Sequence, residues 1–460
     1  MNSDIRERLR RLGVHKGVGH LKPSPARQLE SLRATREVHE DTIAPDASST
    51  LLALERIATP YGNTVLRRAS YGLEHVHGDR ALQLALTQPA QFVSQLASRH
   101  MGASAEPFDL HDALFLDTET TGLAGGAGTL AFLVGIGYFE KVDANSSRFV
   151  VEQYFLRDPI EEAAMLHAID RLAGTHEHLV TFNGRSFDIP LIEARFIMSR
   201  LAPPFGDKLH LDLLMPARRA WRNMLGDCSL GSLEYHLLGV RRNQQDIAGF
   251  LIPELYREYL QSGASAEERP LNNEMQRVMY HNLHDILSMV TLTSRLCEAL
   301  SNPHHTSEHL AIGRQHEHAG EWAEAEGVYR NALQQMEQSQ RTEQPQKSTP
   351  QPQSPRALTP SGLQTQAMRR LANALKKQQR HADAVAHWVE LADLGDVQAA
   401  LELAKHYEWR EVDLPLALGH ARRTLRLAQA SSSGLQSTSA LRTDIERRIV
   451  RLERKVEGAG

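Results

Sequence analysis

The chain has 460 residues, 41% of them hydrophobic and 23% charged, and a formal net charge of −4. This length predicts two or three domains, and the charge excludes a globally basic protein, so any binding of nucleic acid would have to use a local basic patch. The two cysteines, Cys228 and Cys297, exclude a disulfide scaffold and a thiolate zinc site. The sequence shows no signal peptide and no membrane span, which predicts a cytoplasmic protein that does not bind membranes.

The first 300 residues fall into three predicted parts. Residues 1–50 are polar and rich in arginine, and we expect them to be loosely ordered. Residues 51–112 are expected to form an N-terminal extension of the domain that follows. That domain, residues 113–300, alternates strand and helix patterns, which predicts a mixed sheet with helices packed on it. Its predicted strands and surface helix are, in chain order, strands 113–119, 129–140 and 148–156, helix 160–174 and strand 178–184.

Two carboxylates stand close together at the end of the first predicted strand, in the stretch LDTETTG. Asp117 and Glu119 are separated by one residue, so on a strand both side chains point to the same face and repel each other. Such a pair is either solvated at the strand end or binds a cation.

Two further carboxylates lie among apolar residues. Asp188 follows the predicted strand 178–184, and burying an unpaired carboxylate there would be costly. Taken alone, this position favours an interpretation in which Asp188 caps a helix that starts near Pro190. Asp285 lies beside the apolar stripe of a helix predicted over residues 275–300. The two positions are candidates for the same site as the first pair.

The helix at 275–300 also carries a candidate base. His281 lies one turn before Asp285 on the same helical face, whereas Tyr280 points elsewhere. We expect His281 to orient or deprotonate a water molecule, and a purely structural histidine is the alternative.

Five ordered blocks, GLEHVHGD, LDTETTGLAGGAGT, FNGRSFDIPLIEARF, CSLGSLEYHLLGV and HNLHDILSM, carry a family resemblance. Together they resemble the DEDD exonucleases of the ribonuclease-H-like class, and most of all the YprB-like family, over about residues 60–300. The resemblance implies an α/β ribonuclease-H-like domain, a mixed central sheet flanked by helices. It also implies a metal-dependent nuclease, a 3′→5′ exonuclease acting on single-stranded RNA or DNA.

The resemblance further implies a set of site residues. Two Mg²⁺ or Mn²⁺ ions, about 3.5–4 Å apart in enzymes of this kind, would be bound by four carboxylates. Relatives usually carry a tyrosine four residues before the last aspartate or a histidine five before it, and this chain has the reverse order. The implied metal ligands are Asp117, Glu119, Asp188 and Asp285, with His281 as a further catalytic residue. The expected substrate contacts lie beside them: Thr118, Thr121, Gly122, Asn183, Gly184, Arg185 and Phe187.

Local positive charge is available for phosphate contacts, although most of these side chains are expected to be merely solvated. The arginines concerned are Arg185, Arg195, Arg218, Arg219, Arg222, Arg241 and Arg242.

The C-terminal third predicts a helical-repeat domain. Residues 338–362 are rich in Gln, Pro, Ser and Thr, which predicts a disordered linker. Helical segments on both sides of it resemble tetratricopeptide repeats, with a first repeat at 306–337 and further repeats at 363–455. An ordinary helical hairpin domain is the alternative. Repeats of this kind suggest a protein partner, and they leave open a catalytically quiet nucleic-acid-binding or scaffold protein.

Overall fold

The computed structural model describes most of the chain, in eight stretches. They are residues 54–97, 107–122, 128–143, 146–243, 246–262, 269–342, 360–430 and 437–458. The expected loosely ordered segment, 1–50, lies outside the described residues, as does the middle of the expected linker. The two ends of that linker are helical, because α12 (Trp322–Thr342) extends into it and α13 (Pro360–Lys377) begins before its end.

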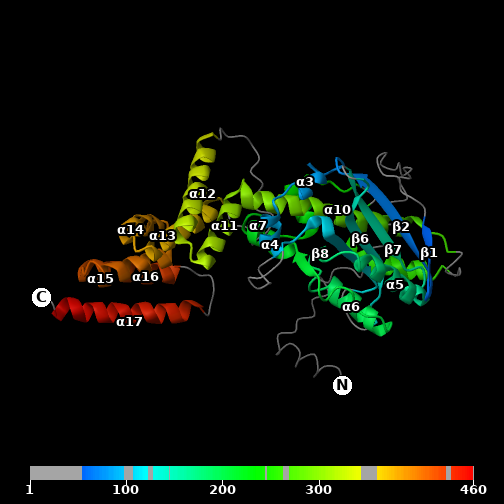
Figure 1. The fold of residues 1–460 in the computed structure, drawn as a ribbon. Coiled ribbons are helices and arrows are strands. Elements are labelled where there is room, and N and C mark those ends of the chain that lie inside the picture. The colour runs from blue at the N-terminus through cyan, green and yellow to red at the C-terminus, as the bar shows by residue number, and fades with distance from the viewer. Residues whose placement is uncertain are drawn as a thin grey trace, which may run out of the picture. The chain divides into compact units, whose positions relative to one another are not determined.

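The chain divides into two compact units. The first comprises Met1–Thr87, Ser104–Asp212 and Leu238–Thr291, and the second comprises Gln88–Ala103, Leu213–Leu237 and Leu292–Gly460. The first unit contains the sheet, and the described part of the second is helical (Figure 1). This division follows compactness, and the domain boundaries expected from the sequence stay predictions.

A mixed sheet of seven strands forms the centre of the first unit, in the order β1-β2-β7-β6-β5-β8-β9. Neighbours from β1 to β5 are antiparallel, whereas β8 and β9 run parallel to β5. The expected mixed sheet is therefore confirmed, together with its four strands; β1, β2 and β9 were not predicted. The strands are β1 (Glu55–Thr59), β2 (Gly62–Gly72), β5 (Ala113–Thr120), β6 (Ala131–Lys141), β7 (Ser147–Phe155), β8 (His178–Thr181) and β9 (Leu209–Asp212).

Helices pack on this sheet and complete a core of apolar side chains. Helix α5 lies against β1, β2 and β7, and α9 lies against β5. The strands are apolar over long runs because the sheet is covered; in β6 every residue from Ala131 to Phe139 is buried. The helices of this unit are α3 (Gln83–Leu86), α5 (Glu162–Ala173), α6 (Asp188–Met198), α9 (Ile252–Leu260) and the first part of α10 (Asn273–Ser301).

Two glycines of β6 allow α10 to approach the sheet closely. A Cβ atom on Gly135 would lie 2.2 Å from Oδ1 of Asn282, and one on Gly137 would lie 2.6 Å from Cγ2 of Ile286. Neither position has room for a side chain, so the helix and the strand come together only because both residues are glycine.

In the second unit, each helix from α11 to α17 packs on the next helix in the chain. Small residues make this possible: a Cβ atom on Gly313 of α11 would lie 2.2 Å from the ring of Tyr329 on α12. None of the helices that the structure describes is long and apolar enough to cross a membrane. The remaining helices are α4 (Ala90–Ala97), α7 (Leu214–Leu225), α8 (Leu230–Leu233), α11 (Thr306–Ala319), α14 (His381–Asp393), α15 (Val397–Trp409), α16 (Leu414–Ala430) and α17 (Ser437–Gly458).

Candidate active site

Strand β5 carries Asp117 and Glu119 near its end, where it lies between β6 and β8. Asp117 is opposite Gly135 of β6, the glycine over which α10 passes. The amide of Asn282 on α10 donates to Oδ2 of Asp117 over 2.9 Å and to its backbone carbonyl over 3.3 Å. The close approach of the helix therefore fixes the orientation of the first carboxylate.

Asn282 is itself held in place by a buried hydrogen-bond network. Nε2 of Gln153 donates to Oδ1 of Asn282 and to the backbone carbonyl of Met279, each over 2.8 Å. Both amide side chains are fully or almost fully buried. Because a buried amide without partners is costly, this network gives Asn282 a single orientation. This role of Asn282 was not predicted, because the only local signal is a polar residue in an apolar helix.

Asp188 is the first residue of α6, and Phe187 stands in the capping position. The interpretation of Asp188 as the cap of a helix near Pro190 is therefore wrong, because the helix starts two residues earlier. The hydroxyl of Thr118 on β5 donates to Oδ1 of Asp188 over 2.5 Å. Burial raises the pKa of Asp188 to about 6, although the hydrogen bond from Thr118 opposes this shift.

The turn between β8 and α6 is held by a carboxylate that the sequence analysis missed. The backbone N–H groups of Asn183 and Arg185 donate to the two carboxylate oxygens of Asp212, over 2.8 and 3.1 Å. Asn183 has a φ of 67°, a left-handed conformation in which asparagine is one of the more tolerated residues. A Cβ atom on Gly184 would lie 2.6 Å from Cβ of Thr181, so a larger residue does not fit.

The other expected substrate contacts lie at the ends of these elements. Nη2 of Arg185 donates to the backbone carbonyl of His210 over 2.5 Å, and the ring of Phe187 is 59% exposed. The turn after β5 is closed by Thr121, whose hydroxyl accepts from the N–H of Leu130 over 2.9 Å. The carbonyl of Gly122 accepts from the hydroxyl of Thr120 over 2.9 Å.

Helix α10 presents Asp285 and His281 on one face, as the sequence predicted, and both meet a basic neighbour. Arg242 forms an ion pair with Asp285 and lies 3.3 Å from Oδ1 of Asp246. Nδ1 of His281 lies 2.7 Å from Oδ1 of Asp246, and its Nε2 lies 3.6 Å from Oδ2 of Asp285. Tyr280 points elsewhere.

The charges around His281 change its proton affinity. Burial on its own lowers the pKa of His281, but the charge of Asp285 and the hydrogen bond to Asp246 outweigh it and raise the pKa above the usual value. Tyr280 instead packs its ring on that of His284, with the ring centroids 4.0 Å apart. His281 contacts Asp246 and lies near Asp285.

The four carboxylates lie close enough to affect one another. The pKa of Asp117 is raised well above its usual value by burial and then by the charges of Asp285 and Asp188. The pKa of Glu119 is raised in the same way, by burial and then by the charges of Asp117 and the other two aspartates. Strand β5, the start of α6 and α10 thus bring four carboxylates from three parts of the chain near enough for their charges to interact.

The donor chemistry of this site fits a hard divalent cation, which prefers carboxylate oxygens. Within the described ranges, however, no three His, Cys, Asp or Glu side chains already converge as a metal site. Instead, Asn282 holds Asp117, Thr118 holds Asp188 and Arg242 holds Asp285. The carboxylates are thus repelled by one another and satisfied by neighbours, and a cation would replace part of these contacts.

Comparison with known proteins agrees with this arrangement. Residues 114–297 match the model of the RNase_H superfamily. Over 406 residues the chain is 31% identical to the uncharacterized protein YprB of Bacillus subtilis (strain 168), and the match covers 85% of this chain and 86% of that protein. The chain belongs to the YprB family. The RNase_H superfamily match of this YprB-family chain includes all four carboxylates and His281, and it supports a nuclease-like enzyme, a hydrolase that binds nucleic acid.

Proposed function

We propose that this YprB-family protein is a metal-dependent nuclease that hydrolyses phosphodiester bonds, and that it acts as a 3′→5′ exonuclease on single-stranded RNA or DNA. The observation that supports this most strongly is the gathering of four carboxylates whose charges repel one another in a domain of the RNase_H superfamily. Buried like charges are unfavourable without a compensating cation, so the grouping of these carboxylates favours a site that binds cations.

The carboxylates of Asp117, Glu119, Asp188 and Asp285 would hold two Mg²⁺ or Mn²⁺ ions. When bound, such ions lower the pKa of a water nucleophile and stabilise the leaving oxygen of a phosphodiester. Burial, and then repulsion by the neighbouring carboxylates, raise the pKa of Asp117 and of Glu119, and a bound cation would offset both unfavourable effects.

The chain's own side chains orient this site. Asn282 and Thr118 direct the carboxylates of Asp117 and Asp188. Asp246 accepts a hydrogen bond from Nδ1–H of His281 in the tautomer that leaves Nε2 free to take a proton from water. In this proposal His281 is the base, and Asp246 is the residue that positions it.

Residues beside the carboxylates would contact the substrate. The exposed ring of Phe187, next to Asp188, offers a surface on which a base can stack without regard to its identity. Thr121 and Gly122 directly follow β5, and Asn183 and Gly184 lie between β8 and Asp188, so we place the substrate-contacting backbone in these two turns.

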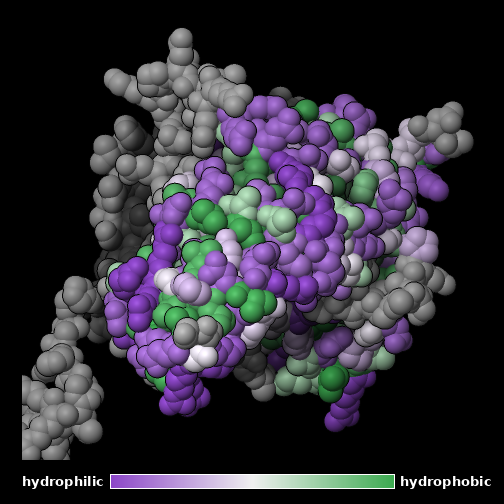
Figure 2. All heavy atoms as spheres, turned by 90° about the vertical axis from the view of Figure 1, so that its left-hand side faces the viewer, coloured by the Kyte–Doolittle hydropathy of each residue, from purple (hydrophilic) through white to green (hydrophobic). Residues whose placement is uncertain are grey.

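The helical unit would bind a protein partner, and its helix pairs are proposed to be tetratricopeptide-like. The sequential packing from α11 to α17 supports this, as does the fit of Gly313 against Tyr329. Figure 2 shows a largely hydrophilic face with a smaller hydrophobic area in its middle. Apolar side chains that are exposed in this unit include Val389, Leu394, Trp409, Val412 and Leu416.

The proposal is tested with end-labelled single-stranded RNA and DNA, incubated in Mg²⁺, Mn²⁺ or chelator. We expect a metal-dependent ladder that shortens from the 3′ end, and no products from a circular strand. Asp188→Asn should abolish it, whereas Asp207→Asn, an exposed carboxylate of the same unit, should not. Equal cleavage by Asp188→Asn and wild type would refute the assignment.

The competing function is a catalytically quiet nucleic-acid-binding or scaffold protein. It is favoured by the single observation that the described ligands are satisfied by Asn282, Thr118 and Arg242 rather than converged. Binding of single strands without cleavage in any metal would establish this function in place of the nuclease.

A further inference from the structure

A basic groove lies in the helical unit, between α7 and α11. It encloses a cavity of about 740 Å³. Four arginines, one asparagine and one histidine supply its polar lining: Arg218, Arg219, Arg222, Asn223, Arg314 and His318. No aspartate or glutamate lines it, and no Phe, Tyr or Trp does either.

The amphipathic pattern of α7 explains why the arginines gather there. Ala217, Ala220 and Trp221 are buried on one side of the helix, so Arg218 and Arg222, four residues apart, point outward along the other side. The two helices are tied together, because Nη2 of Arg314 donates to the backbone carbonyl of Arg219 over 3.0 Å. The positive side chains are thus mounted on a frame of helices rather than on a loop.

The frame beneath the groove is buried and well bonded. Nε1 of Trp221 donates to Oε1 of Glu308 on α11 over 2.7 Å, and Nη2 of Arg295 donates to the same oxygen over 2.5 Å. Glu308 is 1% exposed and already accepts hydrogen bonds from these two internal partners. It does not neutralise the groove.

Two of the four arginines that line the groove have no acidic partner among the described residues. Arg218 and Arg222 are exposed, and neither forms an ion pair with any carboxylate that the structure describes. Guanidinium groups stay protonated at all physiological pH values, so the groove remains cationic in a chain whose net charge is −4. Such a local concentration of one sign attracts a polyanion.

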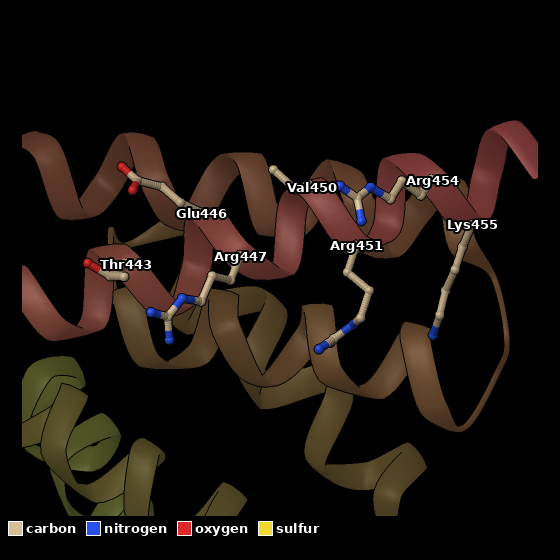
Figure 3. A pocket seen from close by; sticks show the side chains of 7 residues that line it. All are labelled: Thr443, Glu446, Arg447, Val450, Arg451, Arg454 and Lys455. Carbon is tan, nitrogen blue, oxygen red and sulfur yellow. The ribbon is translucent and has the colours of Figure 1, made fainter.

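A second basic surface lies on α17, and some of its basic side chains are neutralised by a carboxylate of the same unit. Arg451 and Lys455 line a shallow pocket there and, with Arg448, form ion pairs with the buried Glu408 of α15. Glu446 lines the same pocket (Figure 3). Arg448, Arg451 and Lys455 of α17 are thus paired with a buried carboxylate, whereas Arg218 and Arg222 of the α7–α11 groove are not.

We propose that the α7–α11 groove binds the phosphate backbone of single-stranded nucleic acid, as a holding site separate from the carboxylates. The planar guanidinium fork can bind two oxygens of one phosphate group with two parallel hydrogen bonds, and arginines along a groove can do so for successive phosphates of a strand. Because no aromatic platform lines the groove, binding is independent of sequence and strongly salt-dependent. The ligand's identity as substrate rests on the proposed nuclease function, but the binding itself does not.

The test measures binding in chelator, so that cleavage plays no part. Fluorescence anisotropy of a labelled 20-nucleotide single strand is followed for the Asp188→Asn protein, with and without Arg218→Ala/Arg222→Ala. We expect Kd to rise at least tenfold at low salt. Single strands release about 0.7 counterions per contacted phosphate, so the slope of log K against log salt should become shallower by about 1.4.

The matched control is Arg447→Ala/Arg454→Ala on α17, which removes two exposed arginines from the same unit. Its Kd should stay within twofold, and thermal unfolding of both double variants should match that of the parent. An unchanged Kd and salt slope for the α7 variant would overturn the proposal. So would a loss of polyglutamate binding with nucleic-acid binding kept, which would make the groove a protein surface.

Failure of this proposal and failure of the nuclease function are distinguishable. If no metal supports cleavage but the α7 variant loses binding, the groove stands and the nuclease does not. If cleavage occurs and the α7 variant binds and cleaves long and short strands like the wild type, the nuclease stands and the groove does not.

Discussion

Substitution of Gly135 by alanine tests how closely α10 must approach the sheet. The new methyl group would lie 2.2 Å from Oδ1 of Asn282 and 2.6 Å from Cδ1 of Ile286. The asparagine oxygen is the end of a side chain, but it cannot turn away without breaking its hydrogen bond from Gln153 and moving the amide that holds Asp117. The perturbation therefore reaches the carboxylate site through the packing.

The expected loss in the free energy of unfolding of Gly135→Ala follows from these contacts. Overpacking a well-filled core costs about 1–3 kcal/mol. The disturbed hydrogen bonds of Asn282 add about 0.5–1.5 kcal/mol each. A total of about 2–4 kcal/mol corresponds to a fall in Tm of about 4–16 °C for a unit of this size. The cleavage rate of the folded Gly135→Ala protein should also fall, because the displaced amide of Asn282 holds the carboxylate of Asp117.

Thermal unfolding by circular dichroism and single-turnover cleavage measure the two effects. Gly206→Ala is the matched control, since a Cβ atom there meets nothing within 4 Å in the same unit. It should leave both Tm and the rate unchanged. A Gly135→Ala protein with wild-type Tm and rate would refute the argument that this glycine positions the site.

Three further predictions concern the base, the cation and the helical unit. His281→Ala should lower the single-turnover rate at least tenfold with Mn²⁺ affinity kept in calorimetry, and a rate within twofold of wild type would rule out its role as a base. Addition of Mn²⁺ should raise Tm of the wild type but not of Asp188→Asn, by an amount equivalent to about 2.7 kcal/mol at 100 times Kd; equal shifts in both would place the ion elsewhere. Burial would raise the pKa of Glu408, but hydrogen bonds from Arg451 and Lys455 and nearby cations lower it below the usual value. Its contribution to stability is therefore complete above the unfolded pKa of about 4.3 and is lost as the pH falls through the lower folded value. In Glu408→Gln this part of the pH dependence of Tm should disappear, and an unaltered acid profile would contradict it.

The sequence predicted the strands whose burial leaves a clear pattern. The apolar runs of β5, β6 and β7 can be recognised in the sequence because both faces of the sheet are covered. Strand β2 does not, because it carries Arg67 and Arg68 in its middle. Arg68 is tolerated there by an ion pair with the buried Glu152 of β7, a contact that depends on pairing between distant strands.

The candidate site also contains some residues that local sequence patterns predict and others that only tertiary contacts reveal. The spacing of Asp117 and Glu119 and the helical periodicity around Asp285 are local, so both could be found in the sequence. The contacts of Asn282 and Asp212 are tertiary: one depends on a helix crossing two glycines, and the other on the neighbouring parallel strand. Local patterns thus supplied the candidate ligands, while only the fold shows which residues orient them.

The order of the strands explains how carboxylates so far apart in the chain meet. Strands β5 and β8 are parallel neighbours, with Phe115 opposite Val180, so the residues that follow both strands emerge at the same edge of the sheet. Asp117 and, after the turn held by Asp212, Asp188 therefore reach that edge from adjacent strands. Helix α10, in the last segment of the chain that belongs to this unit, adds Asp285. Each carboxylate is unfavourable beside the others, so the glycines, the turn and the buried amides that bring them together stabilise an arrangement that the packing of apolar residues alone would not produce.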